Sequence, residues 1–379
     1  MIGTDVCIVG GGIAGLTLAR ALTLRGGTVC VVDRGKIGGG TSSVAAGMLA
    51  PMVEARLQER EVVEFGCEAL RFWREFAGMI EREAEMEIDY RQEGTLVVAV
   101  ERDHIGIINH LHDEQRELGL PVESLSGYEC RKLESYLSPT VSEGFFSTSD
   151  HQVDNRLLLR GLRRICEVQG VRIVEDAGEV TLEQGVGGWI VTAENESISA
   201  RRVVVATGAS LAIFRSLQPK LARLIRPVKG QILRLDQSEM PLLQHVVRTP
   251  DVYFAPKSDG TLIVGASSED RGFDSAVRLG PLYETLQAAW ETIPALYELP
   301  VVESAVGFRP ASLDHAPLLG ETSLEGVYLA TGYYRHGILF APLAAELIAE
   351  EILEEKRDER IRAFNPARFD QMYAERQGD

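Results

Sequence analysis

Three glycines near the start of the chain are spaced as Gly-x-Gly-x-x-Gly, at Gly10, Gly12 and Gly15. They follow the apolar run "DVCIV" and precede "IAGLTLARALTLRGG", which has the periodicity of a helix. In such a turn the first glycine allows a tight bend, the second lets the backbone approach a pyrophosphate, and the third lets helix and strand pack closely. The N-terminus of the helix then faces the phosphate charge. Ile13 and Ala14, between the glycines, belong to the same predicted phosphate-binding turn.

A carboxylate ends the next predicted strand. The run "TVCVVD" ends at Asp33, 18 residues after Gly15, and Arg34 follows it. A carboxylate at this position can accept both hydroxyls of an adenosine ribose, and it would repel a 2′-phosphate. A glycine-rich turn without a ligand is the alternative, but strand, glycines, helix, strand and acid in this order favour dinucleotide binding. NAD and FAD remain as candidates.

A single arginine, Arg309, lies in the mostly apolar and turn-rich stretch "ESAVGFRPASLDHAPLLG", residues 303–320. Its guanidinium group can bind a carboxylate through two parallel hydrogen bonds, which fixes the position of the neighbouring carbon as well as the charge. The alternative is a core arginine that pairs with an internal acid such as Asp314, since buried arginines are normally paired.

Three further segments favour FAD over NAD. Residues 38–51, "GGGTSSVAAGMLAP", offer backbone NH groups and the hydroxyls of Thr41 and Ser42 to the phosphates. Residues 200–210, "ARRVVVATGAS", are typical of a strand that ends in Ala-Thr-Gly. Residues 326–355 give a strand, a glycine turn and a helix, whose N-terminal NH groups and dipole could face the flavin end of the cofactor.

Composition restricts the class of protein. The 379 residues, 45% of them hydrophobic, suffice for a sizeable packed core, and the net charge of −17 argues against a nucleic-acid partner. Five widely spaced cysteines without a CxxC pair indicate a reducing cytoplasm, and no metal-ligand spacing is present. Residues 6–24 match a membrane span in length, but four glycines and Arg20 interrupt them, and the flanking charges do not fit a signal peptide. We therefore expect no membrane insertion and no metal.

The order of elements predicts an α/β protein (α+β overall), with nucleotide-binding segments separated along the chain. Alternating strands joined at Asp259-Gly260 predict an antiparallel sheet as the wall of a second domain, covered by the helix "GPLYETLQAAWETIPALYEL". The mixed charges of residues 354–379, after the last long helix, predict a solvated tail. The expected domains are a discontinuous FAD-binding domain of residues 1–90, 148–220 and 316–365, a substrate-binding domain of residues 91–147 and 221–315, and a C-terminal tail of residues 366–379.

Several segments, in the family's order and over nearly the whole chain, together resemble the D-amino-acid oxidase superfamily of FAD enzymes. They are "GGGIAGL", the strand end at Asp33, "TSSVAAGML", the ATG strand, "PVKGQI", "GFRP" and "GYYRHGILFAP". Within the superfamily the chain looks most like the glycine oxidases of thiamine biosynthesis. The resemblance implies a Rossmann-like two-dinucleotide fold with a mainly antiparallel substrate domain. It also implies FAD-dependent oxidative deamination of glycine, sarcosine or small D-amino acids to a 2-oxo acid, with ammonia or an amine and hydrogen peroxide as the other products.

The resemblance further implies roles for four side chains. Arg309 matches the arginine that binds the substrate carboxylate, Tyr253 a tyrosine that helps to hold it, and Arg335 a substrate-side arginine. Met48 is expected near the flavin ring. Alternatives remain for three of them: Tyr253 as an ordinary strand aromatic, Arg335 as the partner of an acid, and Met48 as core filling. No side-chain base is predicted.

Contacts to a dissociable FAD are expected from the segments above. The flavin is predicted to be non-covalent because related sarcosine oxidases tether it through a cysteine in the C-terminal half, and no cysteine follows Cys166 here. His336 stands where relatives often carry asparagine, which leaves pH dependence and pocket size open. The expected cofactor-binding residues are Gly10, Gly12, Ile13, Ala14, Gly15, Asp33, Arg34, Thr41, Ser42, Ala46, Gly47, Met48, Val180, Thr207, Gly208, Tyr333, Tyr334, Arg335, His336, Gly337, Ile338 and Leu339.

Three rival functions share this fold. One is a dehydrogenase that passes electrons to a quinone or to a partner protein. Another is the oxidase half of a tRNA-modifying enzyme, against which the acidic charge and the lack of a methyltransferase domain count. The third is a non-catalytic FAD-binding subunit. The expected partners are a small amino acid and oxygen, and relatives are commonly homotetramers.

Overall fold

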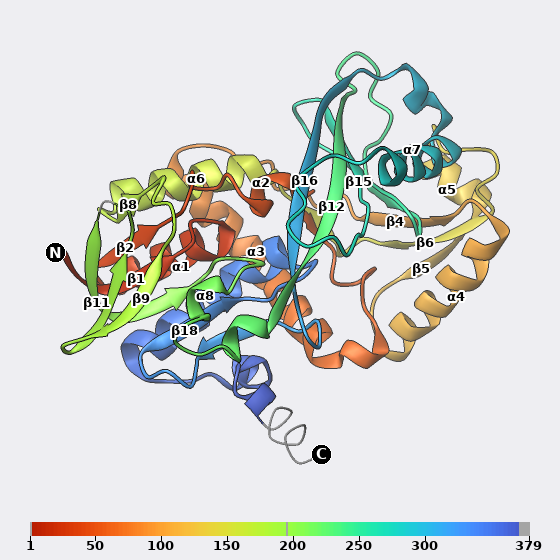
Figure 1. Ribbon diagram of the computed structural model, residues 1–379. Coiled ribbons are helices and arrows are strands. Elements are labelled where there is room, and N and C mark those ends of the chain that lie inside the picture. The colour runs from red at the N-terminus through yellow and green to blue at the C-terminus, as the bar shows by residue number, and fades with distance from the viewer. Residues whose placement is uncertain (1, 195, 371–379) are drawn as a thin grey trace.

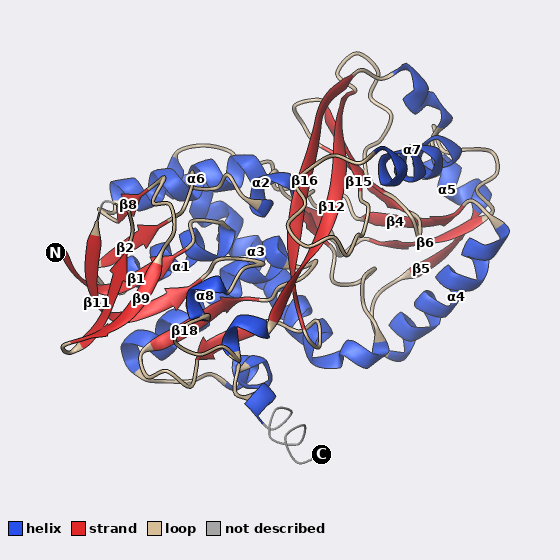
Figure 2. Ribbon diagram, in the orientation of Figure 1, coloured by secondary structure: helices blue, strands red, loops and turns tan. Residues whose placement is uncertain are grey.

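β1 (Ile2–Val9), the apolar run before the glycine turn, lies in the middle of a mostly parallel sheet (Figures 1 and 2). The computed structural model describes residues 2–194 and 196–370. Val6 and Ile8 face one side of this sheet and Cys7 and Val9 the other, and all four are buried, as expected for a parallel strand covered on both faces. The strand order is β17 (Leu318–Glu321), β18 (Val327–Thr331), β11 (Ser197–Val205), β1, β2 (Val29–Val32) and β8 (Arg172–Val174), with the hairpin of β9 (Thr181–Gly185) and β10 (Gly188–Thr192) attached to β11.

Helices from distant parts of the chain pack on one face of this first sheet. Their buried residues, among them Leu16, Trp73 and Leu162, form one apolar cluster with Val6 and Ile8. The opposite face is covered by a second cluster that includes Cys7, Trp189 and Phe214 and lies over the β9–β10 hairpin. The helices of the first cluster are α1 (Ile13–Leu24), α3 (Arg60–Ala84), α6 (Asn155–Val168) and α8 (Gly337–Glu354).

A second, mainly antiparallel sheet forms the other lobe of the molecule (Figure 2). Only its β13–β4 pair is parallel. Helix α7 (Leu279–Thr292) covers one face, with Ala289 packed against Leu233 and Val264 in a separate core. The strand order is β16 (Val301–Ser312), β12 (Ile225–Asp236), β15 (Thr261–Gly265), β14 (Tyr253–Pro256), β13 (Val246–Arg248), β4 (Thr95–Ala99), β6 (Glu143–Ser147) and β5 (Glu123–Ser126), with α4 (Arg102–Glu117) and α5 (Gly127–Leu133) beside it.

The two longest strands, β12 and β16, form an antiparallel ribbon that belongs to both lobes (Figure 1). The pairing runs from Ile225 opposite Ser312 to Leu235 opposite Val301. Ile225 packs in the apolar cluster of the first lobe, whereas Leu235 packs in that of the second. The ribbon therefore joins the two lobes through paired backbone that keeps one register as far as Arg234 and shifts before Leu235.

Shorter elements connect these parts. α2 (Thr41–Val44) and β3 (Met48–Leu49) follow the glycine turn, and β3 pairs with β7 (His151–Gln152). The short 3₁₀ helices are η1 (Leu57–Glu59), η2 (Ala212–Phe214), η3 (Leu221–Arg223), η4 (Pro294–Glu298) and η5 (Glu359–Phe364). The predicted α/β fold class with a second antiparallel sheet is confirmed. The domain boundaries given above remain a prediction.

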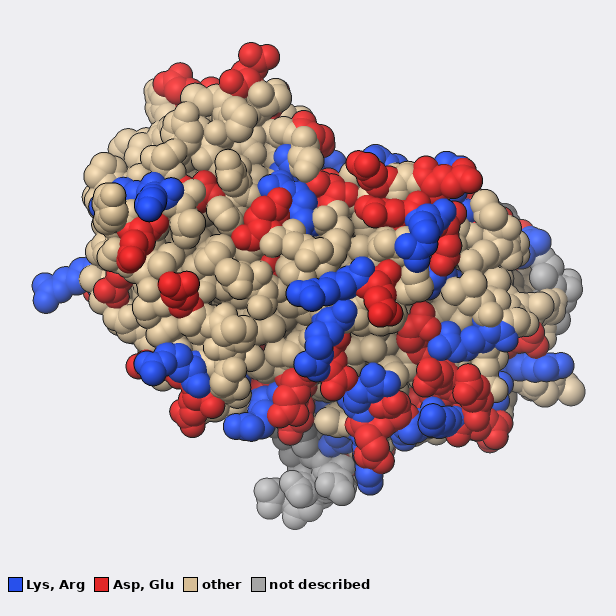
Figure 3. Space-filling view, turned by 180° about the vertical axis from the view of Figure 1, so that it is seen from behind, with Lys and Arg blue, Asp and Glu red and all other residues tan. Residues whose placement is uncertain are grey.

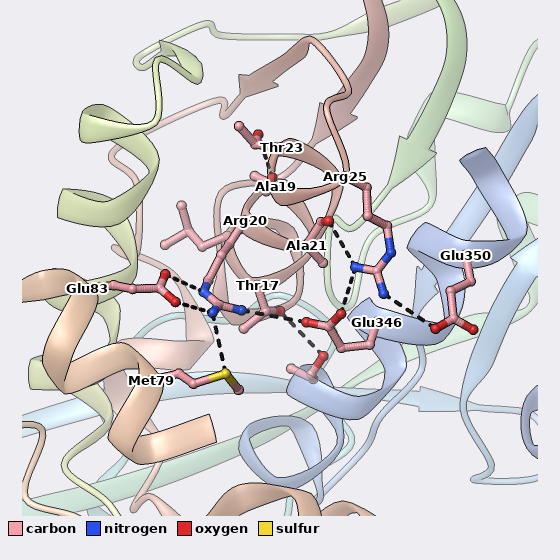
Figure 4. Close-up of polar contacts among 12 residues, drawn as sticks. Thr17, Ala19, Arg20, Ala21, Thr23, Arg25, Met79, Glu83, Glu346 and Glu350 are labelled. Atoms are coloured by element: carbon pink, nitrogen blue, oxygen red, sulfur yellow. Dashed lines mark hydrogen bonds and ion pairs between the residues drawn. The ribbon is translucent and has the colours of Figure 1, made fainter. Parts of the chain in front are cut away.

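A buried arginine joins three helices of the first lobe (Figure 4). Arg20, on α1, is 2% exposed, and its Nε donates to Glu83 Oε2 on α3 at 2.8 Å. Its Nη1 lies 3.6 Å from Glu346 Oε1 on α8, and Arg25 pairs with the same glutamate at 2.7 Å. Because α1 and α8 begin at residues expected to bind the cofactor, this network fixes the relative position of two expected cofactor-binding elements.

The prediction of a solvated C-terminal tail is wrong for the part of it that the structure describes. Ile361 and Phe364, on η5, are buried in the first-lobe core, and Phe369 is 2% exposed. Arg368 pairs with Asp314 at 2.8 Å. The sequence pattern is dominated by charged residues, so the three apolar residues between them gave no signal. Their burial holds this C-terminal segment on the first lobe. Residues 371–379 lie outside the described residues.

Acidic and basic side chains are intermixed over the face shown in Figure 3. No broad basic patch of the kind that binds nucleic acid is visible on that face. Among the described residues, none of the helices combines the length and the apolar character needed to cross a bilayer.

Candidate active site

Two glycines on the second sheet make room for the side chains of Arg309 and Tyr253. A Cβ added to Gly230, on β12, would lie 2.8 Å from Arg309 Nη1, so the guanidinium lies across the bare backbone of Gly230. A Cβ on Gly265, on β15, would lie 2.9 Å from the Tyr253 hydroxyl oxygen. Both polar groups therefore rest on the same sheet at places where any larger residue would displace them.

The Arg309 guanidinium has a backbone partner but no acidic one. Its Nη1 donates to the carbonyl oxygen of Ser267 at 3.1 Å. Asp314, the alternative partner considered from the sequence, pairs with Arg368 instead. Within residues 2–194 and 196–370 no ion pair between Arg309 and a carboxylate is formed. The positive charge of Arg309 is therefore available to an anion from outside the chain.

Tyr253 is partly buried beside this arginine. Burial raises the pKa of Tyr253, while the nearby positive charge of Arg309 opposes that rise. The phenol therefore stays protonated at neutral pH, where it can donate a hydrogen bond to an anion held by Arg309.

These groups line a cavity of about 360 Å³ between the second sheet and the segments that carry the expected flavin contacts. Its walls come from the loop after α2, from strands β13 to β16 and from the loop that leads into α8. The lining residues used below are Met48, Glu54, Arg248, Tyr253, Arg309 and Arg335. The structure thus brings together all four residues predicted for the substrate side.

Arg335 lines the cavity but is already paired. Its Nη2 lies 2.6 Å from Glu59 Oε2, and its Nε lies 3.4 Å from Glu54 Oε2. The alternative role that the sequence left open, an arginine that pairs with an acid, therefore describes the geometry of this side chain. Its predicted role toward the substrate remains a prediction.

Arg248 and Glu54, which pair inside the cavity, are among the lining residues that were missed in the sequence. Arg248 pairs directly with Glu54, and burial lowers the pKa of Arg248 to about 10, with Arg335 adding to the shift. Arg248 lies opposite Tyr253 in the β13–β14 pairing, which places both side chains on one face of the sheet. The three-residue strand β13 is too short for an alternating pattern in the sequence. Only its pairing with β14 shows that Arg248 faces the cavity beside Tyr253.

His336 is partly buried at the start of α8, with its Nδ1 3.4 Å from Glu54 Oε2. Burial lowers the pKa of His336 well below its ordinary value, and the charges of Arg335 and Arg248 lower it further. The imidazole is therefore neutral from its ordinary pKa of about 6.5 upward, so it does not change charge between pH 6.5 and 9.

We expect the variant His336→Asn to show the same pH dependence of kcat/KM between pH 6.5 and 9 as the wild type. The physical reason is that the ring is uncharged over this whole range and its removal deletes no titration. The measurement is a pH profile of both proteins. Loss of an inflection in the variant would show that His336 titrates in the active enzyme.

The turn after β1 fits a bound pyrophosphate. A Cβ on Gly15 would collide with the carbonyl oxygen of Gly10, and one on Gly10 would collide with that of Ala206. The first turn of α1 contains no acidic residue, and the NH of Ile13 is met by Ser42 Oγ at 3.1 Å. The first turn of α1 therefore brings no negative side chain of its own to the positive end of the helix. Gly10, Gly12, Gly15 and Ser42 are the residues that would hold the phosphates.

The other expected cofactor residues lie at the same edge of the first sheet or beside it. Asp33 follows β2, where its carboxylate accepts the NH groups of Gly11 at 2.7 Å and Gly35 at 2.9 Å. Thr207 and Gly208 follow β11, and Thr331 Oγ1 donates to the Gly208 carbonyl at 2.8 Å. Val180 precedes β9 and packs against the cluster that covers the back of the sheet. Their contacts to FAD remain predictions.

Thr41 connects the predicted cofactor loop to the substrate strand. Its Oγ1 donates to the carbonyl of Phe308 at 3.1 Å and accepts the Phe308 NH at 3.0 Å. Phe308 directly precedes Arg309 on β16. The Thr41 hydroxyl therefore binds the Phe308 backbone in this structure, whereas the sequence analysis expects it to bind a phosphate. The two contacts compete for the same hydroxyl.

No group of three or more metal-ligating side chains is assembled in the described parts of the chain. The parallel sheet with its glycine turn, next to a cationic cavity on a second sheet, is an arrangement that fits a nucleotide cofactor beside an anionic ligand. Comparison with known proteins gives the family. Residues 5–351 match the family described as FAD dependent oxidoreductase, and the chain belongs to that family.

Individual relatives cover nearly all of this chain. It is 31% identical over 379 residues to the bifunctional protein ThiO/ThiG of Trichormus variabilis, an alignment that includes 96% of this chain and 55% of that protein. It is 29% identical over 377 residues to a glycine oxidase of Geobacillus kaustophilus, with 96% of each chain aligned. The crystal structure of glycine oxidase from that organism has a TM-score of 0.89 at 27% identity, covering 96% of this chain and 98% of that one.

The chain spans about half the length of the bifunctional curated relatives that it matches. The expected family and its FAD cofactor are confirmed at the level of the family. An iminodiacetate oxidase from Chelativorans has the same fold, with a TM-score of 0.84 at 26% identity.

Proposed function

We propose that this protein catalyses FAD-dependent oxidative deamination of glycine and other small amino acids, including sarcosine and small D-amino acids. The products are the 2-oxo acid, ammonia or an amine, and hydrogen peroxide. The observation that carries the proposal is the Arg309 guanidinium, which faces the cavity beside Tyr253 without an acidic partner. Relatives named glycine oxidase support the choice of substrate.

The charges of the cavity favour a ligand with one carboxylate. Among the described lining residues, Arg248 and Arg335 are paired with Glu54 and Glu59, and the carboxylate of Asp251 is paired with His104. This leaves the charge of Arg309 for the ligand. A charge-assisted pair of hydrogen bonds to a carboxylate holds an amino acid in one orientation as well as at one place.

When bound, FAD supplies the acceptor for the hydride that leaves the α-carbon of the substrate. The chain's own contribution is to bind the carboxylate through Arg309 and Tyr253, to orient the α-carbon and to exclude water. Orientation of this kind can supply much of the rate enhancement. The amine enters in its neutral form, and no side-chain base is assigned. Glu54, the buried acid of the cavity, is engaged by two guanidinium groups.

We expect Tyr253→Phe to raise KM for glycine about tenfold with a smaller change in kcat. The variant keeps the aromatic packing and removes one hydrogen bond to a charged group, which contributes about 1.5 to 3 kcal/mol. Steady-state oxygen consumption with glycine measures both constants. An unchanged KM would show that the hydroxyl does not touch the substrate carboxylate.

A substrate panel scored in two ways tests the proposal. Glycine, sarcosine and D-alanine are mixed with the purified yellow protein, first in an oxygen electrode and then anaerobically, where bleaching of the flavin is followed. Bleaching with oxygen consumption supports the oxidase. Bleaching without oxygen consumption identifies a dehydrogenase, and the absence of bleaching with all substrates identifies a non-catalytic FAD-binding protein.

Three further properties are proposed together with this function. Non-covalent binding of FAD is supported by the position of the last cysteine, Cys166, which is buried and unpaired. A cytoplasmic location is supported by the free state of all five cysteines. Assembly into homo-oligomers is supported by the resemblance alone. Acid-precipitated protein that loses its yellow colour would support dissociable FAD.

A further inference from the structure

The tripeptide Lys229-Gly230-Gln231, on β12, presents its side chains to two opposite faces of the second sheet. Gly230 faces the cavity, where the Arg309 guanidinium lies across it. Because side chains alternate along a strand, Lys229 and Gln231 point to the reverse face. There they contact residues 267–278, the segment that follows β15, which we call the anchored segment.

Lys229 is fully buried, with 0% exposure, although it carries an ammonium group. Its Nζ donates to the carbonyl oxygen of Ala276 at 2.6 Å and to Asp274 Oδ2 at 3.1 Å. Its backbone NH and carbonyl both pair with Glu269 at 3.0 Å. Burying an ammonium group is costly unless it is paired, so these contacts hold both Glu269, near the start of the anchored segment, and its far end on β12.

Gln231 holds the beginning and the end of the same segment. Its Nε2 donates to Glu269 Oε1 at 2.7 Å, and its Oε1 accepts the NH of Arg278 at 2.7 Å. Its backbone NH donates to Ser267 Oγ at 2.9 Å, and Ser267 Oγ donates to the same Glu269 oxygen. Ser267 is thus fixed through both its hydroxyl and its neighbour Glu269.

Ser267 is also the residue that contacts Arg309. Its carbonyl oxygen accepts the hydrogen bond from Arg309 Nη1 at 3.1 Å. Phe273, in the middle of the anchored segment, packs edge-on against Phe308, with ring centroids 5.3 Å apart. The segment therefore contacts both the guanidinium and the residue before it in the chain.

We propose that Lys229 and Gln231 are positioning residues for Arg309. They hold the anchored segment on the reverse face of the sheet, so that the Ser267 carbonyl keeps the guanidinium aimed into the cavity. The inference rests on the proposed function, in which Arg309 binds the substrate carboxylate. Each residue of "KGQ" then has a physical role. Gly230 leaves room for the Arg309 guanidinium, and Lys229 and Gln231 hold the anchored segment on the reverse face.

The first test is limited proteolysis, which needs no catalytic activity. Arg271 lies in the exposed part of the anchored segment, and trypsin cleaves after arginine. We expect cleavage after Arg271 to be at least about tenfold faster in Lys229→Met than in the wild type, because cleavage follows the population of the opened segment. Asp274→Ala, which removes one partner of Lys229 from the surface, is expected to act in the same direction if Lys229→Met does not fold.

The second test uses the FAD-loaded protein and acetate, a carboxylate that cannot be oxidised as an amine. We expect the Kd of acetate, followed by the flavin absorbance, and the KM of glycine each to rise about tenfold in both variants. The kcat should change by less than about threefold, because only the aim of Arg309 is disturbed. Lys132→Met, the same substitution at an exposed lysine of α5, is the matched control and should leave all three quantities unchanged.

The outcomes separate this inference from the proposed function. If the wild type neither binds acetate nor oxidises glycine, the proposed function fails, and Arg309 has no carboxylate for the segment to help bind. If the wild type does both, while Lys229→Met and Asp274→Ala match it in proteolysis and in Kd, the positioning role is overturned. Faster proteolysis with an unchanged Kd would also overturn it, since the segment would then be held without any effect on Arg309.

Discussion

Replacing Arg309 with leucine is expected to lower kcat/KM for glycine about 10³-fold while FAD remains bound. The substitution removes two hydrogen bonds to a carboxylate, each contributing about 1.5 to 3 kcal/mol, and 1.4 kcal/mol corresponds to a factor of ten. It also removes the charge that the cavity offers to an anion, because Arg248 and Arg335 are engaged by glutamates. Oxygen consumption at several glycine concentrations gives kcat/KM, and the ratio of flavin to protein absorbance gives FAD content.

Arg309→Lys is the matched variant for this prediction. It keeps a positive charge but loses the planar fork, so its kcat/KM should lie between those of the wild type and the leucine variant. Loss of FAD from the leucine variant would indicate a structural role for the side chain. Activity within about threefold of the wild type would exclude Arg309 as the carboxylate-binding residue.

Replacing Arg20 with alanine is expected to lower the free energy of unfolding by about 3 kcal/mol. Removal of one member of a buried ion pair leaves the other charges uncompensated, which typically costs about 3 to 5 kcal/mol. Glu83 and Glu346 are partly exposed, at 31% and 22%, so solvent screens their charge and the lower end of that range applies. Urea denaturation of the FAD-loaded protein, followed by tryptophan fluorescence, measures the change.

Arg25→Ala is the control on the same helix. Arg25 also pairs with Glu346, but it is 23% exposed, and surface pairs contribute about 0 to 1 kcal/mol. A double variant, Arg20→Met with Glu83→Gln, should recover part of the loss because it removes one of the unpaired charges. Equal effects of the two single alanine substitutions would contradict the view that burial of Arg20 decides its contribution.

The first lobe was predictable because its signals are local. The apolar run of β1, the glycines that follow and the helix after them are adjacent in the sequence, and the physical demands of that turn leave few alternative residues. Arg309 could be singled out for a similar reason, since a charged residue in an apolar stretch needs a partner. The identity of that partner could not be decided from the sequence, which favours an external carboxylate but also allows Asp314.

The remaining parts of the site depend on contacts between residues far apart in the chain. Glu54 meets Arg248 only because the loop after β3 faces strand β13, and no spacing in the sequence indicates that approach. Lys229 resembles an ordinary strand lysine until the 267–278 segment is seen behind it. The tail was misread because three buried apolar residues, Ile361, Phe364 and Phe369, are separated by charges at intervals that match no simple period.

The shared ribbon of β12 and β16 limits how this molecule can move. Rotation of one lobe against the other about a hinge would have to shear a ladder that keeps one register from Ile225 to Arg234 and shifts only before Leu235. We therefore expect the lobes to behave as one rigid body, with substrate and product passing through an aperture opened by loops. Solvent viscosity should then affect turnover only by slowing the motion of those loops, because no opening of the lobes takes part.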